Sequence, residues 1–164
     1  MTGHAMAGPV WSMAVTGLSV SALVPGMIRA TRRHPVWWRL SLPAGAALPL
    51  FLVLHAAVTL AHAGAAARPP GPMAWWEAAV VVAAVWFWLP VVGTRHRLTD
   101  PGRCLYLYLS MPLLDLPAVG LIAAGEDAAG LAMVVSMLPV GLAALTVTWR
   151  WIHAEEAREL RRTG

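Results

Sequence analysis

The sequence predicts an all-α integral membrane bundle of about five transmembrane helices. Of its 164 residues, 59% are hydrophobic and only 12% are charged, whereas a soluble domain carries about 25% charge. Mean hydropathy is +0.64. Five apolar runs approach the ~20 residues that cross a bilayer core, without the alternation of a membrane β-barrel. One membrane domain fills the chain, with runs at about 9–28, 41–63, 74–93, 104–124 and 130–151 and a tail at 152–164.

The third run shows the membrane pattern most clearly. Trp75 and Trp76 stand at its start, Trp86 and Trp88 stand near its end, and a loop with three arginines follows. Trp is enriched at both membrane interfaces, and Arg is enriched in cytoplasmic loops. This run therefore predicts a helix that crosses the membrane towards the cytoplasm.

The distribution of arginine predicts the orientation of the whole chain. From the N-terminus, the exposed segments hold zero, four, one, three and zero arginines, and the tail holds three, or four with Arg150. Basic loops stay in the cytoplasm, so we expect the N-terminus outside and the C-terminus inside. The net charge of +4 is then a topology signal, and no nucleic-acid partner is expected.

Composition and smaller features extend this interpretation. Heavy use of Ala, Arg, Gly and Pro, with no Lys, favours a bacterial plasma membrane location. Residues 1–8 lack a basic segment, so we expect no cleaved signal peptide. Gly17 and Ser21 form a small-xxx-small pair suited to close helix packing. The charged tail predicts a short solvated helix with i,i+4 pairs, and the single Cys104 excludes an internal disulfide.

Four ionisable side chains lie inside the predicted spans, where they are costly and are functional candidates by default. They are His55, His62, Glu77 and Asp115. The orientation places His62 near the outer surface and His55 about 10 Å deeper on the same helix face, from the helical rise. Glu77 lies one turn below the outer interface, and Asp115 lies near the middle of the fourth run.

Methionines add a second kind of ligand to the outer half. Met133 and Met137 stand at i,i+4 in the fifth run, and thioethers with imidazole favour Cu(I). The sequence therefore predicts a copper site built from His55, His62, Met133, Met137 and Glu77. His55 and His62 are too far apart along one helix to share an ion, so each needs a partner from another segment.

Structural roles for the same residues stay open beside this hypothesis. His62 and Glu77 are close enough to the interface to be solvated, and His55 can hydrogen-bond to a neighbouring helix. Asp115 can be protonated, or can bond a carbonyl freed by one of the two prolines that flank it. Buried methionines are commonly packing residues.

No catalytic set is present, so we expect no enzyme. The sequence contains no HExxH, no Walker loop, no CxxC and no serine in a nucleophile motif. The two His residues inside the spans share one helix and one face, which argues against a bis-His haem.

Residues 50–152 resemble the CtaG-type family of cytochrome c oxidase assembly factors. The segment FWLPVVG at 87–93 is similar to the family's FWxPVxG ending, and RHRLTDPGRCLYLYLSMP at 95–112 is similar to its basic loop and next helix. His55 stands late in its span and Glu77 opens the next, as in the family. Residues 130–133, GLAM, resemble its G-G-x-x-M-W segment.

This resemblance implies a role in maturing haem-copper oxidases, with copper as the cofactor handled and an oxidase subunit as partner. The chain resembles a divergent, shortened member of this family. It has five expected helices against about seven, lacks the early His-x-x-x-His pair, and has Leu54, Ala57 and Ala78 where the family has Trp, Pro and His.

Three functions are therefore open from the sequence. The first is oxidase assembly with copper handling on the outer face of the membrane. The second is a non-catalytic membrane scaffold or subunit of a larger complex. The third is a small proton or ion transporter that uses Asp115, His55 and Glu77, although no internal repeat of the transporter kind is present. The lipid bilayer is the partner common to all three.

Overall fold

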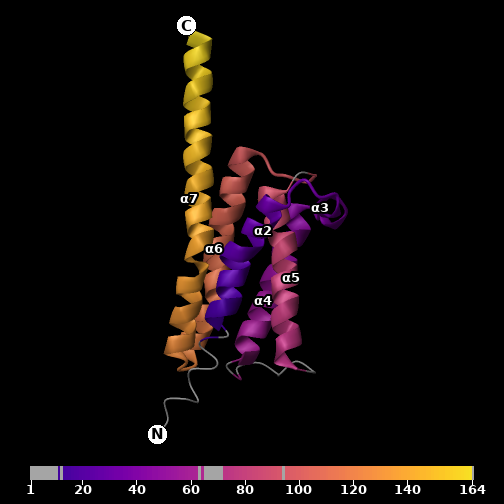
Figure 1. Cartoon of the computed structure of the whole chain (residues 1–164). Helices are drawn as coiled ribbons and strands as arrows, with labels where there is room; N and C mark the ends of the chain where they lie inside the picture. The colour runs from indigo at the N-terminus through magenta and orange to yellow at the C-terminus, as the bar shows by residue number, and fades with distance from the viewer. Residues whose placement is uncertain (1–10, 12, 63, 65–71, 94, 164) are drawn as a thin grey trace.

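The structure, a computed structural model, describes residues 11, 13–62, 64, 72–93 and 95–163, and every regular element in these ranges is a helix (Figure 1). Five of the described helices are long and apolar enough to cross a membrane. The all-helical architecture that the apolar runs predict is therefore confirmed. In chain order the elements are the π-helix η1 (Ser19–Leu23), α2 (Val24–Ala30), α3 (Val36–Leu40), α4 (Ala44–His62), α5 (Met73–Val92), α6 (Asp100–Ala123) and α7 (Asp127–Thr163).

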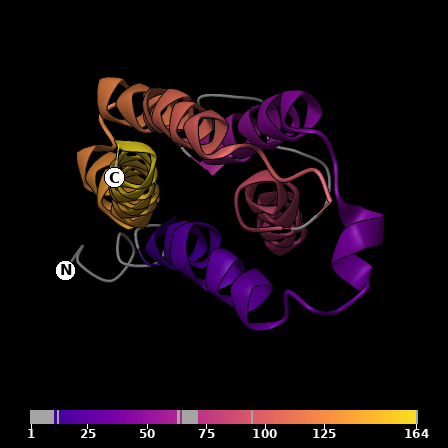
Figure 2. The same cartoon turned by 90° about the horizontal axis from the view of Figure 1, so that it is seen from above.

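The five long helices pack around a common core. The first of them, Met13–Ala30, includes both η1 and α2. Its η1 portion contacts α7, whereas α2 packs on α5. Helices α6 and α7 form the most extensive pair, and α4 packs on both α5 and α6. Seen along the bundle, the first helix runs between α7 and α5, and α6 and α4 lie on the other side (Figure 2).

The arginines gather at one end of the bundle. In Figure 1, α3, the connection from α5 to α6 and the C-terminal half of α7 lie at the upper end, which we name the basic end. The start of α5 and the turn between α6 and α7 lie at the opposite end. The arginines that the structure describes all belong to segments at or near the basic end: Arg29, Arg32, Arg33, Arg39, Arg95, Arg97, Arg103, Arg150, Arg158, Arg161 and Arg162.

The outward surfaces of the long helices are apolar. Val53, Leu109 and Leu142 are all more than half exposed, as are most large apolar side chains on the same outer faces. The interior is apolar too, with Phe87 and Trp88 almost completely buried. A helix that is hydrophobic all round is typical of a core or a membrane span, and the described residues of this chain leave these outer faces uncovered. The surface is therefore compatible with lipid.

The first helix contains a π-helical turn that the apolar run did not predict. The backbone N–H of Val24 donates to the carbonyl of Ser19, five residues back. In the same register the carbonyl of Val20 would accept from residue 25, which is a proline without an N–H. The indole Nε1 of Trp88 donates to this carbonyl at 2.7 Å. A side chain of α5 thus satisfies the backbone group that Pro25 leaves unpaired.

Close packing of the first helix on α7 follows the predicted small-residue pair. A Cβ atom placed on Gly17 would collide with the side chain of Ser136. One turn later the Oγ of Ser21 donates to the carbonyl oxygen of Ser136 at 2.7 Å. The expectation that Gly17 and Ser21 permit close approach is confirmed.

Helix α6 begins at Asp100, four residues before the expected start at Cys104. Thr99 caps it, because its Oγ1 accepts from the backbone N–H of Gly102 at 3.3 Å. Asp100 in the first turn also suits the positive end of the helix dipole. Local capping chemistry therefore extends the helix beyond its apolar run.

Helix α7 continues through the tail as one helix of 37 residues, instead of a span followed by a separate short helix. The described side chains of the tail make i,i+3 contacts, and the expected i,i+4 pairing stays a prediction. His153 contacts Glu156 at 3.0 Å, and Arg158 contacts Glu155 at 2.7 Å. No Gly or Pro interrupts the junction at residue 152, so the helix continues out of the bundle.

Candidate metal site

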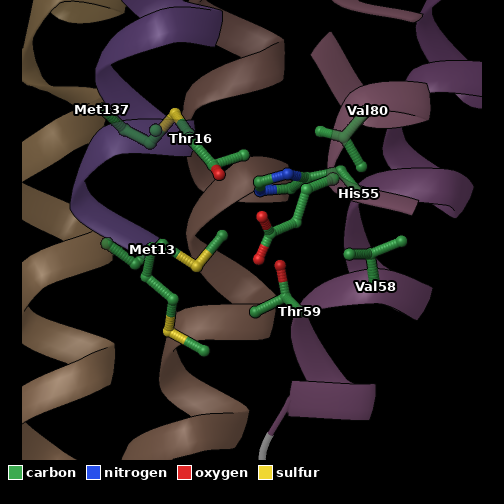
Figure 3. A pocket seen from close by; sticks show the side chains of 10 residues that line it. Met13, Thr16, His55, Val58, Thr59, Val80 and Met137 are labelled. Carbon is green, nitrogen blue, oxygen red and sulfur yellow. The ribbon is translucent and has the colours of Figure 1, made fainter. Parts of the chain in front are cut away.

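A small cavity near the end of the bundle opposite the basic end brings most of the predicted ligands together. It holds about 30 Å³, roughly the liquid volume of one water molecule. The first helix, α4, α5 and α7 each contribute to its wall (Figure 3). The lining residues are Met13, Thr16, Gly17, His55, Val58, Thr59, Glu77, Val80, Met133 and Met137.

Helical spacing of four residues explains how these side chains reach one space. His55 and Thr59 lie one turn apart on α4, and Met133 and Met137 lie one turn apart on α7. Residues at i and i+4 share a helix face, so each pair points the same way. Gly17 has no side chain, and the close approach that it permits brings Met13 and Thr16 beside α7.

His55 is the most constrained polar group of the cavity. Its side chain is only 4% exposed, and its ring stacks on Phe51 with centroids 5.5 Å apart. Among the residues that the structure describes, its Nε2 atom has no hydrogen-bond partner. An unsatisfied buried polar atom costs about 1–3 kcal/mol, and such atoms are rare. The expected bond from His55 to a neighbouring helix is therefore not made by Nε2.

Buried hydroxyl groups elsewhere in the core show the contrast. Ser110 donates to the carbonyl of Leu107 at 2.8 Å, and Ser136 donates to that of Met133 at 2.8 Å. Ser21 is also bonded, to α7. The bundle thus satisfies these hydroxyls locally, while the imidazole of His55 faces a cavity lined by thioethers.

Three methionines complete the soft part of the lining. Met133, Met137 and Met13 are between 4% and 9% exposed. Figure 3 shows Met13 and Met137 across the cavity from His55. Thioether sulfur selects Cu(I) among biological metals. Among the described residues, no three His, Cys, Asp or Glu side chains form a group that could hold a metal ion, so a metal in this cavity needs methionine ligands.

Met13 is the residue that the sequence interpretation missed. The first apolar run holds two methionines, Met13 and Met27, which are fourteen residues apart. A methionine without a second ligand residue one turn away is commonly a packing residue. The available signal was its position four residues before Gly17, on the face that the small-residue pair turns towards a neighbouring helix.

The remaining predicted residues fall into two groups. Glu77, in the first turns of α5, is half-buried and lines the cavity. The side chain of His62, which ends α4, lies outside what the structure describes. The orientation and contacts predicted for His62 therefore stay a prediction.

Asp115 is separated from this group. It lines another cavity of about 60 Å³ between α6 and α7, together with Met111 and Met137. Met137 thus lies between the two cavities. A proton path through His55, Glu77 and Asp115 would have to pass this thioether, which neither accepts nor donates a proton readily.

Cys104 lies outside both cavities. It is 7% exposed, and the hydroxyl of Thr148 donates to its sulfur at 3.4 Å. This thiol therefore packs between α6 and α7 near the basic end.

Comparison of the chain with protein-family models, with curated proteins and with solved structures gives no match. The resemblance to the CtaG-type family stays a prediction, and function is argued from the cavity and its surroundings.

Proposed function

We propose that this protein is a multi-pass membrane protein that binds Cu(I) in the cavity between the first helix, α4, α5 and α7. The observation that carries the proposal is the convergence of His55, with its unpartnered Nε2, and three buried thioethers. One imidazole and two or three thioethers make a soft, low-coordinate site of the kind that Cu(I) prefers.

The charge balance of the cavity supports a bound cation. Imidazole and thioether ligands are neutral, so a bound Cu(I) keeps its positive charge. Burying an unpaired charge is strongly unfavourable, and the carboxyl group of Glu77 lines the same cavity. A carboxyl group in the wall favours a cation over an anion in this cavity.

The proposed topology places this site in the outer half of a bacterial plasma membrane. The basic end is cytoplasmic by the positive-inside rule, which puts the N-terminus outside and the C-terminal part of α7 inside. The cavity then lies in the half of the membrane where the sequence predicts copper handling. Together with the resemblance of residues 50–152, this supports delivery of copper to an oxidase subunit during its assembly.

The test is anaerobic Cu(I) loading of the full chain in detergent, followed by competition with a chromogenic Cu(I) chelator. The double variant Met133→Leu, Met137→Leu removes two sulfurs while keeping side-chain volume. Its matched control, Met27→Leu, Met111→Leu, removes two sulfurs outside the cavity. Loss of partners outside the first coordination shell already costs about 10- to 100-fold in metal affinity, so the cavity variant should lose at least as much. Equal copper affinity in both variants would contradict the proposal.

His55→Leu separates metal binding from packing. Leucine removes an imidazole whose Nε2 is buried and unpaired, so the metal-free protein should unfold no more easily than wild type. Copper retention should nevertheless be lost, and copper content of the host's oxidase should fall. A destabilised His55→Leu protein that still binds copper would show that His55 is a packing residue.

A further inference from the structure

A third and larger cavity lies near the basic end, between the first helix, α5, α6 and α7. It holds about 430 Å³, within the ~300–1,000 Å³ of small-molecule sites. Its inner wall is apolar and includes Trp88, Val91 and Val147. Five guanidinium groups line the same space: Arg29, Arg32, Arg97, Arg103 and Arg150.

These arginines come from separate parts of the chain. Arg29 ends α2, Arg97 stands in the connection before α6, and Arg150 belongs to α7. A positive-inside signal alone needs basic residues near a membrane surface, with no requirement that they face one cavity. Their convergence from several elements on one space is therefore a property of the fold.

Negative charge near this cavity is scarce. No acidic side chain is among its lining residues, and Asp100, which forms an ion pair with Arg103, lies in the adjoining spaces. Further along α7, Glu155 is paired with Arg158. Several like charges around a partly apolar space repel one another more strongly than in water, and a bound anion relieves that repulsion.

Arg103 gives a second indication of an anionic ligand. Its side chain is 14% exposed, although it carries five N–H donors. Its Nε atom is buried and has no hydrogen-bond partner within the described part of the chain. The other four arginines are exposed and remain solvated, so Arg103 is the deepest fixed positive group of the cavity.

The cavity exists because the first helix changes neighbours along its length. Its η1 portion packs closely on α7 through Gly17 and Ser21, and α2 then packs on α5. Figure 1 shows this helix inclined to α7 towards the basic end. The space between the first helix and α7 is therefore wide at the basic end and narrows to the close contact at Gly17 and Ser21 within the bundle.

We propose that this cavity binds the phosphate headgroup of an anionic phospholipid. Guanidinium groups bind phosphate oxygens in a bidentate manner, and basic pockets between transmembrane helices bind anionic headgroups on the cytoplasmic side. The apolar wall below the arginines suits the glycerol and acyl portions of a lipid, which a free phosphate lacks. The proposal depends on the membrane topology and is independent of the copper site.

The test measures binding of short-chain phosphatidylglycerol to the full chain in a neutral detergent, by isothermal titration calorimetry. Short-chain phosphatidylcholine, sn-glycerol 3-phosphate and inorganic phosphate serve as comparison ligands. The variant Arg29→Gln, Arg150→Gln removes two cavity charges, and Arg161→Gln, Arg162→Gln removes two charges from the end of α7. At about fivefold per arginine, affinity for phosphatidylglycerol should fall roughly 25-fold in the cavity variant and stay within about twofold in the control.

A lysine variant and the comparison ligands test the proposal further. Arg29→Lys, Arg150→Lys keeps the charge but loses the bidentate geometry, so its affinity should lie between those of wild type and the glutamine variant, which separates loss of a ligand contact from failure to fold. Equal loss in both glutamine variants, or equal affinity for phosphatidylcholine, would overturn the site. Equally tight binding of glycerol phosphate or inorganic phosphate would show a soluble phosphate site and overturn the lipid assignment.

Discussion

Trp88 stands where the sequence predicts a membrane-interface anchor, but it also makes a buried hydrogen bond to another helix. An indole near the end of an apolar run is typical of an interface anchor, yet this side chain is 1% exposed and donates to the carbonyl of Val20. Tyr106 acts similarly, because its hydroxyl donates to the carbonyl of Phe87 at 3.0 Å. Polar atoms of aromatic side chains thus bond backbone groups of neighbouring helices in the buried interior.

The substitution Trp88→Phe should destabilise the bundle measurably. It leaves the carbonyl of Val20 without the indole donor, which costs about 1–3 kcal/mol, and it adds a smaller cavity cost. Titration with sodium dodecyl sulfate in mixed micelles, monitored by circular dichroism, gives the change in the free energy of unfolding. Trp149→Phe is the control, since Trp149 is 66% exposed. Equal midpoints for the two variants would contradict this role of Trp88.

At the scale of elements, apolar runs predicted the five long helices because length and hydrophobicity alone decide whether a helix spans a bilayer. The π-helix was not predictable in this way, since it depends on a donor from α5 as well as on Pro25. Helix α3 was expected as part of a loop. It is fixed by tertiary contacts, with Arg95 stacked 5.1 Å from the ring of Trp38 and donating to that residue's carbonyl.

For the candidate site too, the sequence predicted which residues share a face of one helix, but not which helices lie side by side. Spacing within α4 and α7 predicted that His55 with His62, and Met133 with Met137, share helix faces. Arginine counts give the direction of each helix but not its neighbours, so the convergence of these faces required the structure. Met13 was missed for this reason, and Asp115 proved to lie on the far side of Met137.

The contact between the first helix and α7 can be tested at a single glycine. Gly17→Ala places a methyl group against Ser136, and overpacking of this kind costs about 1–3 kcal/mol. The same shift should move Met13 away from His55 and weaken Cu(I) binding. Gly26→Ala in α2 is the matched control, because a Cβ there meets nothing within 4 Å and alanine favours a helix by about 1 kcal/mol. Equal stability and copper affinity in the two variants would show that this contact does not shape the cavity.

At the scale of the whole molecule, the two cavities proposed as binding sites lie towards opposite ends of the bundle. The thioether cavity lies near the end of the bundle that holds the turn between α6 and α7, whereas the arginine cavity lies near the basic end. An outside supply of copper and an inside leaflet rich in anionic lipid would then each meet the cavity of matching chemistry. Orientation in the membrane is therefore the property on which both proposals depend.

Cysteine labelling tests this orientation directly. In a Cys104→Ser background, single cysteines replace His34, Ala128 or Leu145, all of which are exposed in the structure. A membrane-impermeant maleimide should label Ala128→Cys in intact spheroplasts and His34→Cys only after permeabilisation, because the basic end is expected inside. Leu145→Cys on the outer face of α7 should stay unlabelled in both conditions, since lipid covers it. The three helices α4, α5 and α6 separate residues 34 and 128, so labelling from the same side would mean that one of them does not cross the membrane. The opposite pattern would invert the orientation and place the arginine cavity outside.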